Sequence, residues 1–304
     1  VPTLSLIIWS LILVVMFKYV LLVMEANEDG EGGIMTLVSL ASSKDPAKGK
    51  RKHRSFLVLL GVFGAALLYG DGVITPAISV VSALEGVKEA NERLHGPLGP
   101  EFLKYFIPTA AILILGGIFW LQKIGTGKVG LYFGPITMIW FLVIGGLGAL
   151  ALVLNSQVFG EIIWALNPLE GIKMLLERPT MGILILGAVF LSVTGAEALY
   201  ADMGHFGQKP IRAAWSFIVF PALILNYFGQ GAFAMVALEK AQAAGIALET
   251  RDWFFLMSPE ALRIPMIILT GLATIIASQA VITGAYSLTQ QAIQLGLLPR
   301  MKIV

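Results

Sequence analysis

Seven apolar runs along the chain are each long enough to cross a lipid bilayer as a helix. A bilayer core of about 30 Å needs roughly 20 apolar residues in an α-helix. The runs contain no Asp, Glu, Lys or Arg except Lys18, Asp71 and Glu197. We expect a single transmembrane domain over 1–304, with spans at about 3–24, 55–82, 106–122, 129–154, 179–200, 213–238 and 264–290.

The composition is typical of an integral membrane protein. Of the 304 residues, 57% are apolar and 13% are charged, whereas a soluble domain carries about 25% charged residues. The mean hydropathy is +0.83. A net charge of +2 gives no basic surface for nucleic acid. Because the chain has no cysteine, a disulfide scaffold and a cysteine-bound metal are also excluded.

The basic residues of the loops predict an orientation in the bilayer. Twelve Lys and Arg residues fall in the loops expected on one side, 25–54, 123–128, 201–212 and the tail 295–304. The loops on the other side hold eight basic and eleven acidic residues. Because cytoplasmic loops carry the excess of Lys and Arg, we expect Val1 outside and Val304 inside.

Two connecting loops contain apolar stretches that are too short to span. EIIWALNPLEGIKMLLE, within 155–180, is interrupted by Asn167 and Pro168. We expect a short helix there in the membrane interface, with Trp164 at the headgroups. GEGGIMTLVSLA has clustered glycines, but no strand precedes them and Glu31 is acidic. We interpret this segment as a tight turn with packing contacts, and not as a phosphate-binding loop.

Asp71 lies near the middle of the span 55–82. An ionised side chain at the bilayer centre costs about 2.5–3.5 kcal/mol and usually marks an ion or proton pathway. Pro76 cannot donate a backbone hydrogen bond, which frees the carbonyl of Gly72 beside the carboxylate. Thr75, at i+4, shares a helix face with Asp71. We expect this pair to face a hydrated cavity; the alternative is that Thr75 bonds into its own helix and Asp71 pairs with a neighbouring helix.

Glu197 follows Gly195 near the inner end of the run 179–200. An interruption at Gly195 would expose backbone groups at mid-membrane, which is tolerated only where they line a cavity. Transporters with discontinuous helices build ion sites in this way. The span would then continue through ADMGHFG, with Asp202 at the inner mouth, and Thr194 would share a face with Glu197 at i−3. Without the interruption, Glu197 is an exposed acid at the helix end.

Other polar residues inside the spans allow two interpretations each. Lys18 either extends its stem to the interface or serves as a counter-ion to one of the acids. Ser278, Gln279, Thr283 and Ser287 either add oxygens to a cavity or bond between helices.

Carboxylates and hydroxyls together suit a dehydrated monovalent cation. Hydroxyls, freed carbonyls and one carboxylate form an oxygen cage without excessive fixed charge. A second carboxylate inside the membrane can carry a proton. Asp71 with Thr75, and Glu197 with Thr194, therefore favour proton-coupled cation transport over an anion pore.

Two competing classes fit the residues less well. An intramembrane aspartyl protease uses two aspartates and a G-x-G-D element, whereas Leu68 occupies the first glycine position and the partner acid would be Glu197. A channel would show a re-entrant filter loop or symmetric repeats, and neither is evident. Because the protease elements do not match, we expect no enzyme.

Five stretches resemble the KUP/HAK/KT family of potassium-uptake permeases, and bacterial members most. They are NEDGEGGIMTLVSL (27–40), YGDGVITPAISVVSALEG (69–86), SVTGAEALYADMGHFG (192–207), LNYFGQGA (225–232) and IASQAVITGAYSLTQQA (276–292). The resemblance implies a LeuT-like (APC-type) fold of two inverted five-helix repeats. It also implies potassium–proton symport by alternating access across the bacterial inner (plasma) membrane. Potassium and the proton would be the transported species, with no bound cofactor, and a homodimer stays open.

The resemblance also assigns parts of the chain. The seven spans would be the family's second to eighth helices, and the first helix, the last helices and the C-terminal cytoplasmic region have no counterpart. We therefore expect a piece of a longer protein that does not transport alone.

The site residues follow from the same resemblance. The potassium site would comprise Asp71, Thr75, Thr194, Glu197 and Tyr200, with proton coupling at Glu197 and Asp71. The alternatives are an amino-acid or other cation symporter of the same fold, and a channel-like potassium uniporter. A carboxylate on the third helix disfavours an amino acid, because it would repel the substrate carboxylate.

Overall fold

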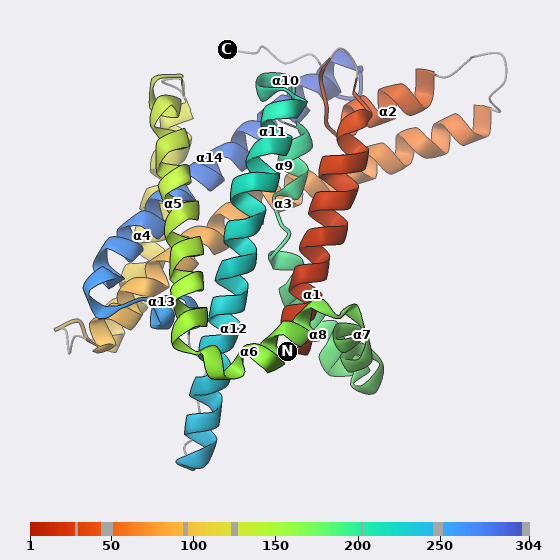
Figure 1. Cartoon of the computed structure of the whole chain (residues 1–304). Coiled ribbons are helices and arrows are strands. Elements are labelled where there is room, and N and C mark those ends of the chain that lie inside the picture. The colour runs from red at the N-terminus through yellow and green to blue at the C-terminus, as the bar shows by residue number, and fades with distance from the viewer. Residues whose placement is uncertain are drawn as a thin grey trace.

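The structure is a computed structural model whose regular elements are helices (Figure 1). It describes residues 1–27, 30–43, 51–93, 97–122, 127–201, 203–245 and 252–299. The α-helices are α1 (Pro2–Ser10), α2 (Ile34–Ser43), α3 (Arg51–Arg93), α4 (Pro100–Gln122), α5 (Gly127–Leu154), α6 (Phe159–Ile162), α7 (Pro168–Glu177), α8 (Pro179–Leu191), α9 (Ala196–Ala201), α10 (Met203–Phe206), α11 (Gln208–Ala214), α12 (Phe220–Ala243), α13 (Trp253–Met257) and α14 (Arg263–Gln294). Wider π-helical turns form η1 (Leu11–Leu22) and η5 (Trp215–Val219), and 3₁₀ turns form η2 (Val23–Glu25), η3 (Ser156–Val158), η4 (Ile163–Leu166) and η6 (Glu260–Leu262).

Within the described part of the chain, seven helices are long and apolar enough to cross a membrane. They run over Pro2–Glu25, Phe56–Lys88, Pro100–Trp120, Leu131–Leu154, Pro179–Ala201, Gln208–Ala243 and Glu260–Gln294. Each overlaps one of the apolar runs of the sequence. The all-α integral membrane class is therefore confirmed.

The helix α3 is much longer than the apolar run that predicted it. It covers 43 residues and continues through Pro76 to Arg93. The polar segment VKEANER at its end contains good helix formers, so the helix continues beyond the apolar part. Asn91 then turns the chain back, since its side chain donates to the carbonyl of Leu98 at 2.8 Å and accepts from the Leu98 N–H at 3.2 Å.

The long helices cross one another in two directions. Figure 1 shows α3 and α14 running obliquely, whereas α1, α5 and α12 stand more upright. Tyr69 of α3 and Thr289 of α14 are hydrogen-bonded through their hydroxyl groups. A Cβ atom at Gly229 of α12 would lie 2.4 Å from the carbonyl oxygen of Gly148 on α5. The backbones of α5 and α12 therefore touch, and this contact requires glycine.

The connections lie at two opposite ends of the molecule. Figure 1 shows α2 and α10 at one end, and α6, α7, α13 and the N-terminus at the other. At the α10 end, Arg212 forms an ion pair with Glu25 at 2.9 Å. The described connections thus alternate between the two ends of the molecule, and which end faces the cytoplasm stays a prediction.

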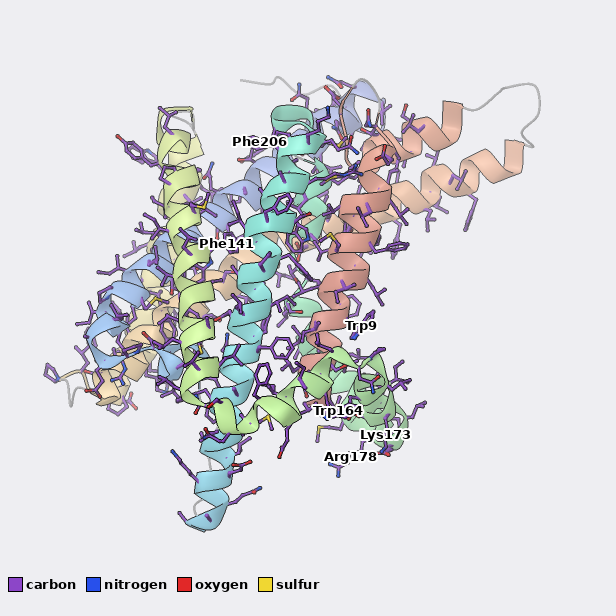
Figure 2. All side chains as sticks on the ribbon, viewed as in Figure 1. Trp9, Phe141, Trp164, Lys173, Arg178 and Phe206 are labelled. Carbon is purple, nitrogen blue, oxygen red and sulfur yellow. The ribbon has the colours of Figure 1, made fainter. Side chains whose placement is uncertain are left out.

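The segment after α5 forms a series of short helices, as expected, and its location in the membrane interface stays a prediction. The break falls at Asn167, whose side chain caps α7 by accepting from the N–H of Leu169 at 3.1 Å. Ser5 fixes the break to α1 by donating to the Asn167 carbonyl at 2.8 Å. Figure 2 shows Trp164 and Lys173 projecting at this end of the molecule.

The glycine-rich segment before α2 makes the expected turn. Gly30 and Gly33 have φ values of +87° and +108°, a region that favours glycine. The apolar residues that follow form the helix α2, which the interpretation as a turn with packing contacts did not include. Thr36 stabilises its first turn by donating to the carbonyl of Gly32 at 3.0 Å.

Candidate functional site

The fifth span is interrupted shortly after its middle. α8 ends at Leu191 and α9 begins at Ala196. Between them the chain turns, and Gly195 has a φ of +85°, a conformation that costs an L-residue with a side chain roughly 1–2 kcal/mol. The structure therefore confirms the interruption at Gly195 and places Glu197 in the first turn of α9.

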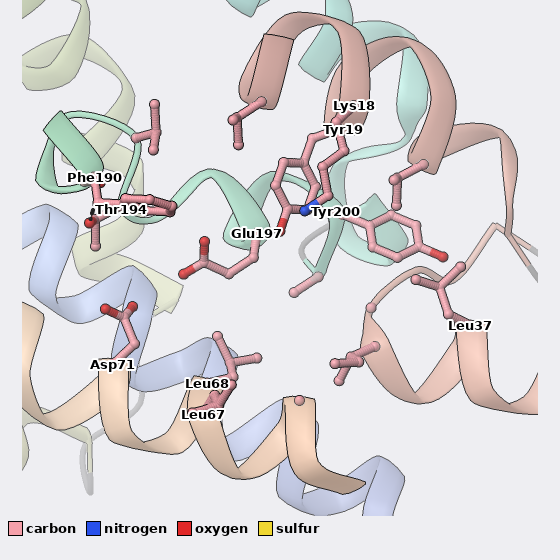
Figure 3. A pocket seen from close by; sticks show the side chains of 17 residues that line it. Lys18, Tyr19, Leu37, Leu67, Leu68, Asp71, Phe190, Thr194, Glu197 and Tyr200 are labelled. Atoms are coloured by element: carbon pink, nitrogen blue, oxygen red, sulfur yellow. Dashed lines mark hydrogen bonds between the residues drawn. The ribbon is translucent and has the colours of Figure 1, made fainter. Parts of the chain in front are cut away.

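A cavity of about 480 Å³ borders this interruption. Asp71 from α3 and Glu197 from α9 both line it, and Figure 3 shows their carboxyl groups turned toward each other. Most of the other lining side chains are apolar. Two acids that are 126 residues apart in the sequence thus share one void between the helices.

Thr75 orients the Asp71 carboxylate. Its hydroxyl donates to Asp71 Oδ1 at 2.6 Å, so the i+4 spacing brings the two side chains together. Asp71 Oδ2 is buried and finds no hydrogen-bond partner among the described residues. Oδ2 therefore lacks the partner that a buried polar atom normally has. Thr75 does not line the cavity itself and acts on it through Asp71.

Thr194 lines the same cavity as Glu197, but not for the reason predicted. The i−3 spacing brings two side chains together only in a continuous helix, whereas Thr194 lies in the turn between α8 and α9. Its hydroxyl donates to the carbonyl of Phe190 at 3.1 Å. The hydroxyl proton is therefore engaged, whereas the lone pairs of the oxygen can still accept.

Tyr200 lies at the opposite side of the cavity and is almost fully buried. Its hydroxyl donates to the carbonyl of Ala26, and Figure 3 shows the ring extending away from Asp71 and Glu197. The structure therefore brings the Tyr200 ring to the cavity but not its hydroxyl to the two acids.

Lys18 and Tyr19 also line the cavity. The sequence allowed two interpretations of Lys18, a stem that extends to the interface or a counter-ion of one of the acids. In the structure its ammonium group points into the cavity (Figure 3). The Nζ atom lies 4.7 Å from the centre of the Tyr19 ring. Tyr19 was missed, although an aromatic residue beside an intramembrane lysine is a signal for a cation–π contact.

The polar residues of α14 do not join this cavity. Ser278 and Gln279 are buried in the protein, and the Thr283 hydroxyl donates to the carbonyl of Gln279 at 2.9 Å. Ser287 lines a separate cavity of about 210 Å³, together with Glu31 and glutamines of α14. Ser287 therefore lines a cavity, as one of the two interpretations has it, but none of these residues lines the Asp71–Glu197 cavity.

The predicted position of Asp202 at the inner mouth lies outside the described residues. Within the described part, no group of three or more His, Asp or Glu residues is arranged to hold a metal ion.

Comparison with known proteins gives relatives of nearly the whole chain. A "Probable potassium transport system protein Kup 1" from Rhizorhabdus wittichii is 53% identical over 99% of the chain. Proteins named "Probable potassium transport system protein Kup" from Caulobacter vibrioides and Pseudomonas fluorescens are 52% and 49% identical over 98% and 99% of it. The chain spans 43–44% of the length of these relatives.

No solved structure matches the chain. The sequence model described as "K+ potassium transporter integral membrane domain" matches residues 1–304. Together with the relatives at about half identity, this match extends over all seven spans and over both acids of the cavity. The chain belongs to the K+ potassium transporter family.

Proposed function

We propose that the complete transporter containing this chain takes up potassium, and that Asp71 and Glu197 bind the ion. The observation that carries the proposal is the shared cavity, in which carboxylates from α3 and α9 face each other between membrane spans. Membership of the potassium transporter family and the names of the relatives support the choice of cation. Potassium is the transported substrate here, not a resident cofactor.

Oxygen atoms of different kinds would hold the ion. Asp71 Oδ2 is free of hydrogen bonds within the described residues, while Thr75 fixes the other carboxylate oxygen. The Thr194 hydroxyl donates a hydrogen bond to the carbonyl of Phe190, so the lone pairs of its oxygen are available to a cation. Tyr200 enters the proposal as a neighbour of the ion, because its hydroxyl is bonded to Ala26.

The second carboxylate gives a reason for proton coupling. Two carboxylates that face one cavity repel each other, so a proton or a cation between them is favoured over two bare charges. If Asp71 acts mainly as the ligand of potassium, Glu197 is the acid that exchanges a proton as the ion arrives and leaves. We therefore propose potassium–proton symport.

The interrupted span supports alternating access. Discontinuous helices at a mid-membrane site are typical of transporters built from inverted repeats, in which one helix bundle moves against the other. The turn at Ser192–Gly195 between α8 and α9 is such an interruption. We propose on this basis a LeuT-like fold for the complete protein, which acts as a multi-pass protein of the bacterial inner membrane, alone or as a homodimer.

An uptake screen of the complete protein in proteoliposomes tests the proposal. Potassium, rubidium, caesium, sodium and amino acids are offered separately, and we expect transport of potassium and rubidium that Glu197→Gln abolishes. Glu170→Gln is the matched control, because Glu170 lies on α7, away from the cavity. Amino-acid transport without rubidium transport would instead support the symporter alternative.

A further inference from the structure

Lys18 is a charged group that has no role in the proposed binding of potassium and the proton. It lines the same cavity as Asp71 and Glu197, with its ammonium end turned inward (Figure 3). Among the described residues Lys18 makes no ion pair, and its Nζ atom lies 4.7 Å from the centre of the Tyr19 ring. An intramembrane lysine normally pairs with an acid or extends to the interface, so its position in this cavity requires an explanation.

Anchoring at the inner interface does not explain Lys18. It precedes Glu25, the last residue of its span, by seven positions, or roughly 10 Å at 1.5 Å per residue. That end of the span already has a cation, because Arg212 donates to the carbonyls of Val20 at 2.8 Å and Leu21 at 3.1 Å. Arg212 also pairs with Glu25. Lys18 is therefore free to act within the cavity.

We propose that Lys18 is the counter-ion of the empty site: its ammonium group offsets one of the two negative charges of Asp71 and Glu197 when no potassium ion is bound, and the incoming ion displaces it. The proposal rests on the proposed function. An ammonium group and a potassium ion carry the same charge and seek the same oxygen atoms. The lysine stem is flexible and its head offers three donors, so the head can move between two sets of partners.

The Tyr19 ring supplies the second set of partners. A cation over an aromatic face is stabilised by the ring quadrupole, and the Lys18 ammonium lies within reach of this ring, 4.7 Å from its centre. When the ion leaves, the ammonium group returns to the carboxylates, which would otherwise face each other as two bare charges during the return of the empty carrier. Lys18 is thus a positioning residue for the return step and not a ligand of potassium.

This role predicts a separation of two fluxes in the complete transporter. Net uptake of radioactive rubidium into potassium-free vesicles requires the empty carrier to return, whereas exchange of rubidium for internal potassium does not. We expect Lys18→Met and Lys18→Gln to lower net uptake roughly tenfold, equivalent to about 1.4 kcal/mol on the return step. Exchange should continue near the wild-type rate, and it also reports that the variants are folded.

Lys173→Met is the control, since Lys173 lies on the surface of α7 and pairs with Glu177 at 3.8 Å. It should leave both fluxes unchanged. If the Lys18 variants keep both fluxes or lose both, the counter-ion role is wrong. A wild-type protein that moves no rubidium in either assay would refute the proposed function instead, so the two failures are distinguishable.

Discussion

Thr75 donates to one oxygen of the Asp71 carboxylate at 2.6 Å, and the other oxygen has no hydrogen-bond partner among the described residues. Asp71→Asn removes the charge and puts an amide group at the site. We expect the half-saturation concentration for rubidium uptake to rise roughly tenfold or more, because bonds to charged groups contribute about 1.5–3 kcal/mol. Thr75→Val keeps the side-chain shape and removes a donor. Its effect should be smaller, about threefold to tenfold. Initial uptake rates in proteoliposomes measure both changes.

Thr137→Val is the matched control for Thr75. The Thr137 hydroxyl donates to the carbonyl of Phe133 at 2.6 Å within α5 and does not line the cavity. Its removal should leave the half-saturation concentration unchanged. An unaltered value in Asp71→Asn would exclude Asp71 as a ligand of the transported ion.

Residue spacing predicted the candidate site only where the helix continues. Asp71 and Thr75 meet as expected, because α3 is helical through both positions. For Thr194, the turn before α9 invalidates the spacing argument. The Tyr200 bond to Ala26 joins residues 174 positions apart, so no local pattern in the sequence could have predicted it.

At the scale of elements, the interruption depends on one glycine. Gly195→Ala should destabilise the turn by about 1–2 kcal/mol, because a residue with a side chain is strained at a φ of +85°. Steric clash does not contribute, since nothing lies within 4 Å of the added Cβ. We expect rubidium uptake to fall roughly 5- to 30-fold, the factor that corresponds to this cost. Gly187→Ala in α8 also meets open space, at an ordinary helical φ. It is the control. If both variants took up rubidium at the same rate, the turn at Gly195 would not be required for transport.

The lengths of the elements show what an apolar pattern predicts and what it misses. The bilayer thickness sets a minimum apolar length, so all seven spans could be located from the sequence. It sets no maximum for the helix, and α3 therefore continues into polar sequence as far as Arg93. The turn at Gly195 was predictable because glycine and an acid occur together inside an apolar run. The direction of Lys18 was not, since its stem reaches either the interface or the cavity.

At the scale of the whole molecule, coupling distinguishes a symporter from a uniporter. If Glu197 exchanges a proton as potassium binds to the cavity that it shares with Asp71, each inward transport cycle carries a proton into the vesicle. Uptake of potassium by the complete protein should then acidify the lumen, as a trapped pH-sensitive dye reports. An imposed gradient, acidic outside, should drive rubidium inward. Glu197→Gln should abolish both effects, whereas Glu170→Gln should retain them. Uptake that neither acidifies the lumen nor responds to the gradient would identify a uniporter or a different coupling ion.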